Sequence, residues 1–118
     1  MKIVVIEDNP DIMDVVDYVL TSDGHELIPC KDGSIESELG DIKPDLVFID
    51  EYLPVKRGSD ICKHIKTSPH LRHLPVVLIS TVPNIGKIAK QSGADAYLEK
   101  PFELSDLIAL THKFIPTA

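Results

Sequence analysis

Short apolar runs alternate with longer segments of mixed polarity along the whole chain. Four of the runs are rich in Val, Ile, Leu or aromatic residues and are short enough to be strands. The first, third and fourth runs are continuously apolar, as strands that are covered on both faces of a sheet must be. The five predicted strands cover residues 2–6, 25–30, 45–50, 75–80 and 94–99.

The segment after the first run has the pattern of an amphipathic helix. Asn9 suits the N-cap, Pro10 the first helical position and Gly24 the turn after the last one. A spacing of i, i+3, i+4, i+7 and i+8 places the apolar residues on one face and leaves the opposite face acidic. These apolar residues are Ile12, Val15, Val16, Val19 and Leu20.

Further helices are predicted after each of the other strands, at about 34–40, 58–67, 84–92 and 103–114. Pro83 fixes backbone dihedrals and Gly86 loosens them, so the helix at 84–92 is expected to be short or displaced. The third helix is expected to carry Ile61, Cys62 and Ile65 on one side. The apolar residues of the fifth are Leu104, Leu107, Ile108 and Leu110.

A strand–helix order that repeats five times predicts one architecture. A parallel pair of strands needs a crossover connection, and that crossover is right-handed, so the helices cover both faces of a parallel sheet. We therefore predict an α/β, doubly wound fold. The length of 118 residues fits a single domain, residues 1–118, that buries about two thirds of its unfolded surface.

Composition narrows the function. Hydrophobic residues make up 43% and charged residues 26% of the chain, the balance of a soluble globular protein. A formal net charge of −7 repels phosphate backbones and anionic lipids, so we expect no direct nucleic-acid binding and no membrane binding. No apolar run approaches the roughly 20 residues of a membrane span, and two carboxylates follow the start too soon for a signal peptide.

These features predict a cytoplasmic protein with no domain before residue 1. The sequence leaves open whether an output domain follows residue 118. Cys30 and Cys62 form no metal-binding or redox motif, so we expect free, mostly buried thiols. His70 and His73 lie in a loop-like stretch without a third ligand, and we expect them to be solvated rather than bound to a metal.

Polar residues gather where the predicted strands end, which is where open parallel sheets bind ligands. Clustered carboxylates repel one another, and a hard cation such as Mg²⁺ relieves that repulsion. A carboxylate beside the metal can act as a nucleophile toward a phosphoryl group, while a lysine and a hydroxyl stabilise the transferring oxygens. The residues at this rim are Glu7, Asp8, Asp50, Ser80, Thr81, Lys100 and Pro101.

Four motifs in this order, KIVVIEDNP, DLVFIDEYLP, PVVLIS and GADAYLEKPF, resemble a receiver domain of the two-component response regulators, of the chemotaxis-receiver type. The resemblance covers essentially the whole chain. It implies the flavodoxin-like strand order 2-1-3-4-5. It also implies a signalling switch that catalyses only its own phosphorylation and dephosphorylation, and is therefore not an enzyme acting on a free substrate.

The resemblance assigns roles at the rim. Asp50 matches the phosphoaccepting aspartate, and Glu7 and Asp8 match the acidic pair that holds Mg²⁺. Tyr52 stands where the family supplies a backbone carbonyl to the metal. The phosphoryl donor would be a sensor histidine kinase or a histidine phosphotransfer protein.

The resemblance also assigns a switch. Ser80 matches the hydroxyl that turns toward the phosphoryl group, Tyr97 the aromatic switch residue, and Lys100 the lysine of the K-P-F element. The bond between Lys100 and Pro101 is usually cis in the family. The fourth helix, fifth strand and fifth helix would form the surface that a downstream protein reads, and we expect a monomer or a weak dimer.

Several residues depart from the family pattern. Lys56 and Arg57 make the loop after Asp50 unusually basic, which either balances the acidic rim or draws in a phosphodonor. Thr81 stands where a small residue is usual, so small-molecule donors are expected to react slowly. Tyr52 and Val82 are bulky, and their exclusion of water predicts a long-lived acyl phosphate.

Three other functions remain to be weighed. A receiver-fold interaction module that is never phosphorylated is the main alternative. A phosphatase of the haloacid-dehalogenase type would carry a DxD pair on its first strand, where this chain has EDN. A flavodoxin-like cofactor protein would need a hydroxyl-rich phosphate loop, and EDNPD would repel that phosphate.

Overall fold

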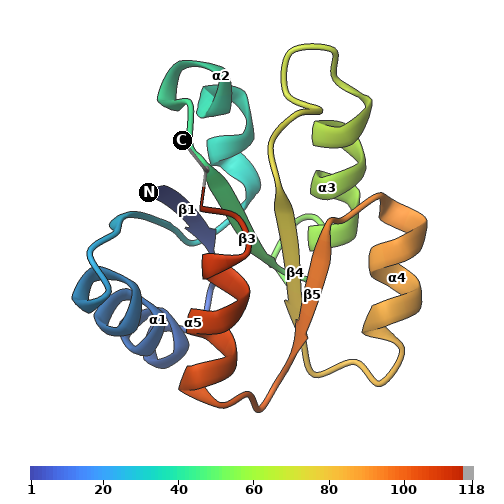
Figure 1. Ribbon diagram of the computed structural model, residues 1–118. Helices are drawn as coiled ribbons and strands as arrows, with labels where there is room; N and C mark the ends of the chain where they lie inside the picture. Colours follow the sequence, from blue (N-terminus) through green and yellow to red (C-terminus); the bar gives the residue numbers. More distant parts are fainter. Residues whose placement is uncertain (116–118) are drawn as a thin grey trace.

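A parallel sheet with strand order β2-β1-β3-β4-β5 forms the centre of the protein (Figure 1). The computed structural model describes residues 1–115, so residues 116–118 of the predicted domain lie outside the described residues. The strand order agrees with the order that the resemblance implied. Each strand also agrees with a predicted one to within two residues: β1 (Lys2–Ile6), β2 (Glu26–Cys30), β3 (Leu46–Asp50), β4 (Val76–Ser80) and β5 (Ala96–Glu99).

Helices cover both faces of the sheet, which confirms the doubly wound α/β fold (Figure 1). The helices α1 and α5 pack on one face, and α2, α3 and α4 pack on the other. The helical elements are α1 (Pro10–Ser22), the 3₁₀ helix η1 (Gly33–Glu38), α2 (Leu39–Ile42), α3 (Gly58–Thr67), α4 (Ile85–Ser92) and α5 (Leu104–His112). In the described residues no helix has both the length and the apolar character that crossing a membrane requires.

The alternation of side chains along the strands builds two apolar layers. Val4 and Ile49 belong to the layer beneath α2, α3 and α4, whereas their neighbours Val5 and Phe48 belong to the layer beneath α1 and α5. β1, β3 and β4 are buried almost along their full length. This burial on both faces is the reason that their sequences are continuously apolar.

The predicted signals at the ends of α1 are confirmed. Oδ1 of Asn9 accepts hydrogen bonds from the backbone N–H groups of Asp11 (2.9 Å) and Ile12 (3.3 Å), and Pro10 is the first helical residue. Gly24, with a φ of 90°, occupies the left-handed conformation that ends the helix. These are local interactions, which explains why the sequence alone predicts them.

The helix predicted at 34–40 differs from the observed one. Residues Gly33–Glu38 form a 3₁₀ helix, and only Leu39–Ile42 are α-helical. Gly33 packs so closely on α3 that a Cβ atom would come within 2.7 Å of Cδ1 of Ile61. A short 3₁₀ connector fits this tight approach, and Lys43, with a φ of 54°, ends the segment in the left-handed region.

The last two helices correspond to the predicted segments, but with shorter ends. As expected, α4 is short, with eight residues, and it is followed by Gly93, which has a φ of 83°. The helix α5 ends at His112 rather than near 114. Leu104, the first residue of α5, is exposed, whereas Leu107 is buried in the layer beneath α1 and α5.

Candidate functional site

The carboxyl ends of β1 and β3 bring three carboxylates together. Glu7 and Asp8 follow β1, and Asp50 is the last residue of β3. Each of the three offers an oxygen atom, and these atoms all lie within 4.8 Å of one another. Glu7 and Asp50 are buried, with exposed fractions of 2% and 6%, whereas Asp8 is exposed. The cluster is therefore buried at Glu7 and Asp50 and open to solvent at Asp8.

Lys100 connects this cluster to the end of β5. Its Nζ atom donates to both carboxylate oxygens of Glu7 at 3.2 Å and to Oδ2 of Asp50 at 3.1 Å. The backbone N–H of Lys100 donates to the carbonyl oxygen of Ser80 at 2.8 Å, which ties the residue to the end of β4. The Lys100–Pro101 bond is cis, as the resemblance implied.

The positive charge of one lysine does not balance this cluster. Burial and, after it, the neighbouring Asp50 together raise the pKa of Glu7 to about 7, although Lys100 acts in the opposite direction. A carboxyl group with this pKa is poorly stabilised as an anion. A hard divalent cation with oxygen ligands would supply the charge that is lacking, so the residues present fit Mg²⁺.

Asp50 is held in place by the loop that follows it. Oδ1 of Asp50 accepts a hydrogen bond from the backbone N–H of Tyr52 at 3.2 Å. Gly58 packs directly on the backbone of Asp50, and a Cβ atom at position 58 would overlap the Asp50 carbonyl oxygen. Any other residue at position 58 would have to displace the end of β3, and with it the carboxylate.

Glu51 is a buried carboxylate to which the sequence analysis assigned no role. Its Oε1 accepts from the backbone N–H of Ser59 at 2.6 Å, and its Oε2 accepts from the Ser59 hydroxyl at 3.0 Å. Arg57, the N-cap residue of α3, makes no side-chain cap hydrogen bond. Glu51 therefore caps α3 from eight residues away, and a search for caps adjacent to the helix does not detect it.

The two basic residues of the loop contact groups outside the acidic cluster. The guanidinium of Arg57 lies 5.6 Å from the centroid of the Tyr52 ring, a cation–π arrangement. Nζ of Lys56 lies 3.2 Å from Oε2 of Glu36 in η1. Among the described residues, then, neither side chain forms an ion pair with Glu7, Asp8 or Asp50.

The end of β4 carries the predicted switch hydroxyl. Ser80 is fully buried, and its Oγ accepts a hydrogen bond from the backbone N–H of Val82 at 3.0 Å. The hydroxyl keeps its own proton for donation to another group. Thr81 is exposed at the rim and Val82 is half-buried.

Tyr97 lies on the outer part of the sheet, with 47% of its surface exposed. A Cβ atom at Gly86, in α4, would come within 3.1 Å of Cζ of the Tyr97 ring. The glycine thus leaves room for the aromatic ring between β5 and α4. The sequence analysis read Gly86 only as a residue that weakens the helix, and missed this contact.

Comparisons with known proteins agree with this architecture. The response regulator receiver domain family matches residues 3–112. The DNA-binding dual master transcriptional regulator RpaA of Synechocystis is 32% identical over 111 residues, which are 92% of this chain and 46% of RpaA. The chain therefore spans about half the length of this relative.

Two solved receiver domains have the same fold. The receiver domain of NtrX from Brucella abortus is 34% identical, with a TM-score of 0.86 over 98% of this chain and 99% of that one. The receiver domain of the sensor histidine kinase PA1611 from Pseudomonas aeruginosa, with a magnesium ion in its active-site cleft, is 24% identical, with a TM-score of 0.87 over 96% and 95%. With a family match over nearly its whole length, the chain belongs to the response regulator receiver domains.

Proposed function

We propose that this receiver domain is a phosphorylation-dependent switch in which Asp50 accepts a phosphoryl group in the presence of Mg²⁺. The observation that carries the proposal is the position of Nζ of Lys100, 3.1 Å from Asp50 and 3.2 Å from Glu7. A half-buried lysine between two buried carboxylates places positive charge where a phosphoryl group on Asp50 would need it.

The metal ligands would be the carboxylates of Glu7, Asp8 and Asp50 and the backbone carbonyl of Tyr52. The oxygen atoms of the three carboxylates already lie within 4.8 Å of one another, and all of them are of the type that Mg²⁺ prefers. When bound, the ion would neutralise charge on the phosphoryl oxygens. The PA1611 receiver, with a magnesium ion in its active-site cleft, supports this assignment.

The transfer itself requires a positioned nucleophile. A carboxylate oxygen of Asp50 forms a bond to phosphorus while the bond from phosphorus to the donor nitrogen breaks, and the donor histidine takes back the electron pair. Tyr52 holds Oδ1 of Asp50 and Lys100 holds Oδ2, so the carboxylate is oriented before the donor arrives. The donor would be a sensor histidine kinase or a histidine phosphotransfer protein.

The signal would leave the site through Ser80 and Tyr97. Phosphorylation adds a charge of about −1.5 to −2 and three acceptor oxygens, which favours a conformation with the Ser80 hydroxyl turned toward Asp50. Tyr97 would then move inward from its half-exposed position. Because its ring lies against Gly86, this movement would displace α4. Together with β5 and α5, α4 would form the surface that a downstream protein binds.

The test compares the wild-type chain with Asp50→Asn in the presence of beryllofluoride, a mimic of the phosphoryl group, and Mg²⁺. We expect bound fluoride resonances in the fluorine NMR spectrum of the wild-type protein, dependent on Mg²⁺, and none in Asp50→Asn. Asp17→Asn removes an exposed carboxylate in α1 and should behave as the wild type. Uptake by Asp50→Asn equal to that of the wild type would exclude Asp50 as the acceptor.

The experiment also needs a variant of Thr81, because this side chain narrows the entrance to the site. Thr81→Ala is expected to take up small phosphodonors faster than the wild type. If neither protein responds to beryllofluoride or to a histidine kinase, the chain is an interaction module that uses the receiver fold without phosphorylation.

A further inference from the structure

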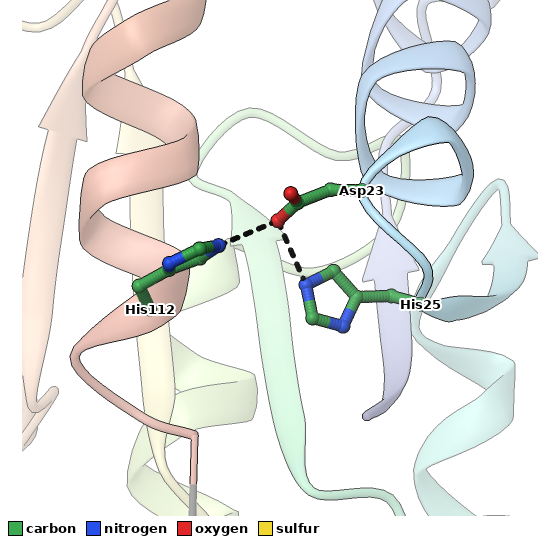
Figure 2. A group of neighbouring side chains, drawn as sticks. All are labelled: Asp23, His25 and His112. Carbon is green, nitrogen blue, oxygen red and sulfur yellow. Dashed lines mark hydrogen bonds and ion pairs between the residues drawn. The ribbon is translucent and has the colours of Figure 1, made fainter.

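A second cluster of side chains that could bind a metal ion lies at the amino-terminal end of β2, where α1 and α5 end (Figure 2). The acidic cluster lies at the opposite, carboxyl ends of the strands. Asp23 follows the last residue of α1, His25 immediately precedes β2, and His112 is the last residue of α5. Asp23 and His25 are close in the sequence and His112 is 89 residues from Asp23, and the proposed switch uses none of the three.

The geometry of the cluster is that of one carboxylate shared by two imidazoles. Oδ2 of Asp23 lies 3.1 Å from Nε2 of His25 and 2.7 Å from Nε2 of His112 (Figure 2). The side chain of His25 is 6% exposed, that of Asp23 26% and that of His112 50%. The cluster therefore has a buried member that fixes its position and an exposed member that gives access from solvent.

We propose that Asp23, His25 and His112 form a binding site for a divalent transition-metal ion, with Zn²⁺ as the best-matched ion. One atom of each side chain lies within 4.8 Å of the others. Zn²⁺ binds imidazole nitrogen and carboxylate oxygen at about 2.0–2.2 Å, which sets tetrahedral ligand atoms about 3.4 Å apart. The observed nitrogen–oxygen distances of 3.1 and 2.7 Å would need to lengthen by about 0.3 and 0.7 Å, and a water molecule would complete the tetrahedron.

The protonation states of Asp23, His25 and His112 are compatible with metal binding. A metal ion on both Nε2 atoms requires each imidazole to carry its ring proton on Nδ1, so a proton on Nε2 would move to Nδ1, or would pass to solvent where the ring is an imidazolium. The hydrogen bond from His112 lowers the pKa of Asp23, so this ligand is ionised at neutral pH. Nδ1 of His25 lies 2.9 Å from the amino group of Met1, which as an ammonium donates to it; with a metal ion on Nε2, the amine would release one proton to solvent and accept from Nδ1–H instead.

Ligand chemistry separates this site from the acidic cluster. The cluster at Asp50 offers only carboxylate oxygens, which suit Mg²⁺, whereas two imidazoles and one carboxylate suit Zn²⁺ and its neighbours in the transition series. Excess Mg²⁺ should therefore leave the second site free for Zn²⁺. Bound zinc would link the end of α1, the start of β2 and the last turn of α5, and would raise the melting temperature of the folded protein.

The test is calorimetric titration of the untagged 118-residue chain with Zn²⁺ in excess Mg²⁺. We expect one zinc ion per chain and release of protons to the buffer. Cobalt(II) should give the visible absorption of a tetrahedral nitrogen–oxygen site. His112→Gln and Asp23→Asn should each weaken binding by about tenfold or more, while circular dichroism shows that both remain folded.

The matched control is His73→Gln, which removes an exposed histidine elsewhere on the surface. It should bind zinc as the wild type does. Two results would overturn the proposal: zinc affinity that changes less than about threefold in His112→Gln, or zinc binding that is lost in His73→Gln. The outcome is independent of the switch, because the titration involves no phosphoryl donor and leaves Asp50 unchanged.

Discussion

Nζ of Lys100 lies 3.1 Å from Oδ2 of Asp50, and their side chains are 11% and 8% exposed. The same ammonium group also holds Glu7, whose side chain is 2% exposed. Lys100 is therefore the cation that allows two neighbouring carboxylates to remain buried. A buried charge that loses its partner is costly, so this lysine has a structural role as well as its proposed role toward the phosphoryl group.

Replacement of this lysine should destabilise the protein. We expect Lys100→Gln to lower the free energy of unfolding by about 1–3 kcal/mol near pH 8, because Glu7 and Asp50 then repel each other without a cation between them. Urea unfolding measures the change. Lys87→Gln, which removes an exposed lysine of α4, should alter stability by less than about 0.5 kcal/mol. Equal losses in the two variants would contradict the role assigned to Lys100.

Glu7→Gln should have the opposite effect on the metal-free protein. Burial and Asp50 raise the pKa of Glu7 to about 7, from 4.5. The stabilising contribution of this raised pKa is fully present below about pH 4.5 and is lost as the pH rises through 7. Glu7→Gln should thus be more stable than the wild type at about pH 8, by an amount on the order of 1 kcal/mol, with a smaller difference at about pH 5.

The same variant should bind Mg²⁺ more weakly, because it lacks one carboxylate ligand. Thermal unfolding in a chelator and in excess Mg²⁺ separates the two effects. If the variant gains no stability in the chelator near pH 8, burial of the Glu7 carboxylate does not destabilise the protein. If the variant binds Mg²⁺ as the wild type does, Glu7 is not a ligand.

Gly86→Ala should displace the ring of Tyr97. The added Cβ would lie 3.1–3.3 Å from two ring atoms and the hydroxyl oxygen of Tyr97, closer than ordinary van der Waals contact. The protein has three tyrosines, so a single ring-labelled NMR spectrum can follow the signal of Tyr97. Gly40→Ala is the matched control: its Cβ would meet nothing within 4 Å, and it should stabilise α2 by about 0.5–1 kcal/mol without moving the tyrosine signals.

Tyr52 and Val82 are predicted to prolong the phosphorylated state. Tyr52 is half-exposed and its ring is held beneath Arg57, while Val82 is half-buried beside Ser80. The combination of Tyr52→Asn and Val82→Glu should admit water to the acyl phosphate and speed its decay by about tenfold or more. Decay is timed by intact mass after the donor is removed.

Val55→Glu is the control for this lifetime. Val55 lies in the same loop as Tyr52 and is 90% exposed, so the substitution adds the same charge without opening the site. Its decay should match that of the wild type. Decay in the double variant that is unchanged or slower would show that these side chains do not limit the access of water.

Local signals explain most of what could be predicted about the fold. Asn9 and Pro10 mark the start of α1 through contacts within four residues. The continuously apolar strands indicate burial on both faces. The 3₁₀ geometry of η1 was not predictable in this way, since it accompanies the close approach of Gly33 to Ile61, a residue of another helix.

The acidic cluster was predictable because parallel strands deliver their carboxyl ends to one rim. Sequence position did not indicate which neighbours each rim residue would bind. The cap that Glu51 provides for Ser59 spans eight residues, and the contact between Asp23 and His112 spans 89. Such contacts are formed by the packing of whole helices and strands, so no local sequence pattern predicts them.

The most direct test of the switch is the intact mass of the chain after incubation with a histidine kinase, ATP and Mg²⁺. We predict a gain of one phosphoryl group per chain, its loss when a chelator replaces Mg²⁺ before the reaction, and no gain in Asp50→Asn. The same gain in Asp50→Asn would contradict the assignment of Asp50 as the phosphoacceptor.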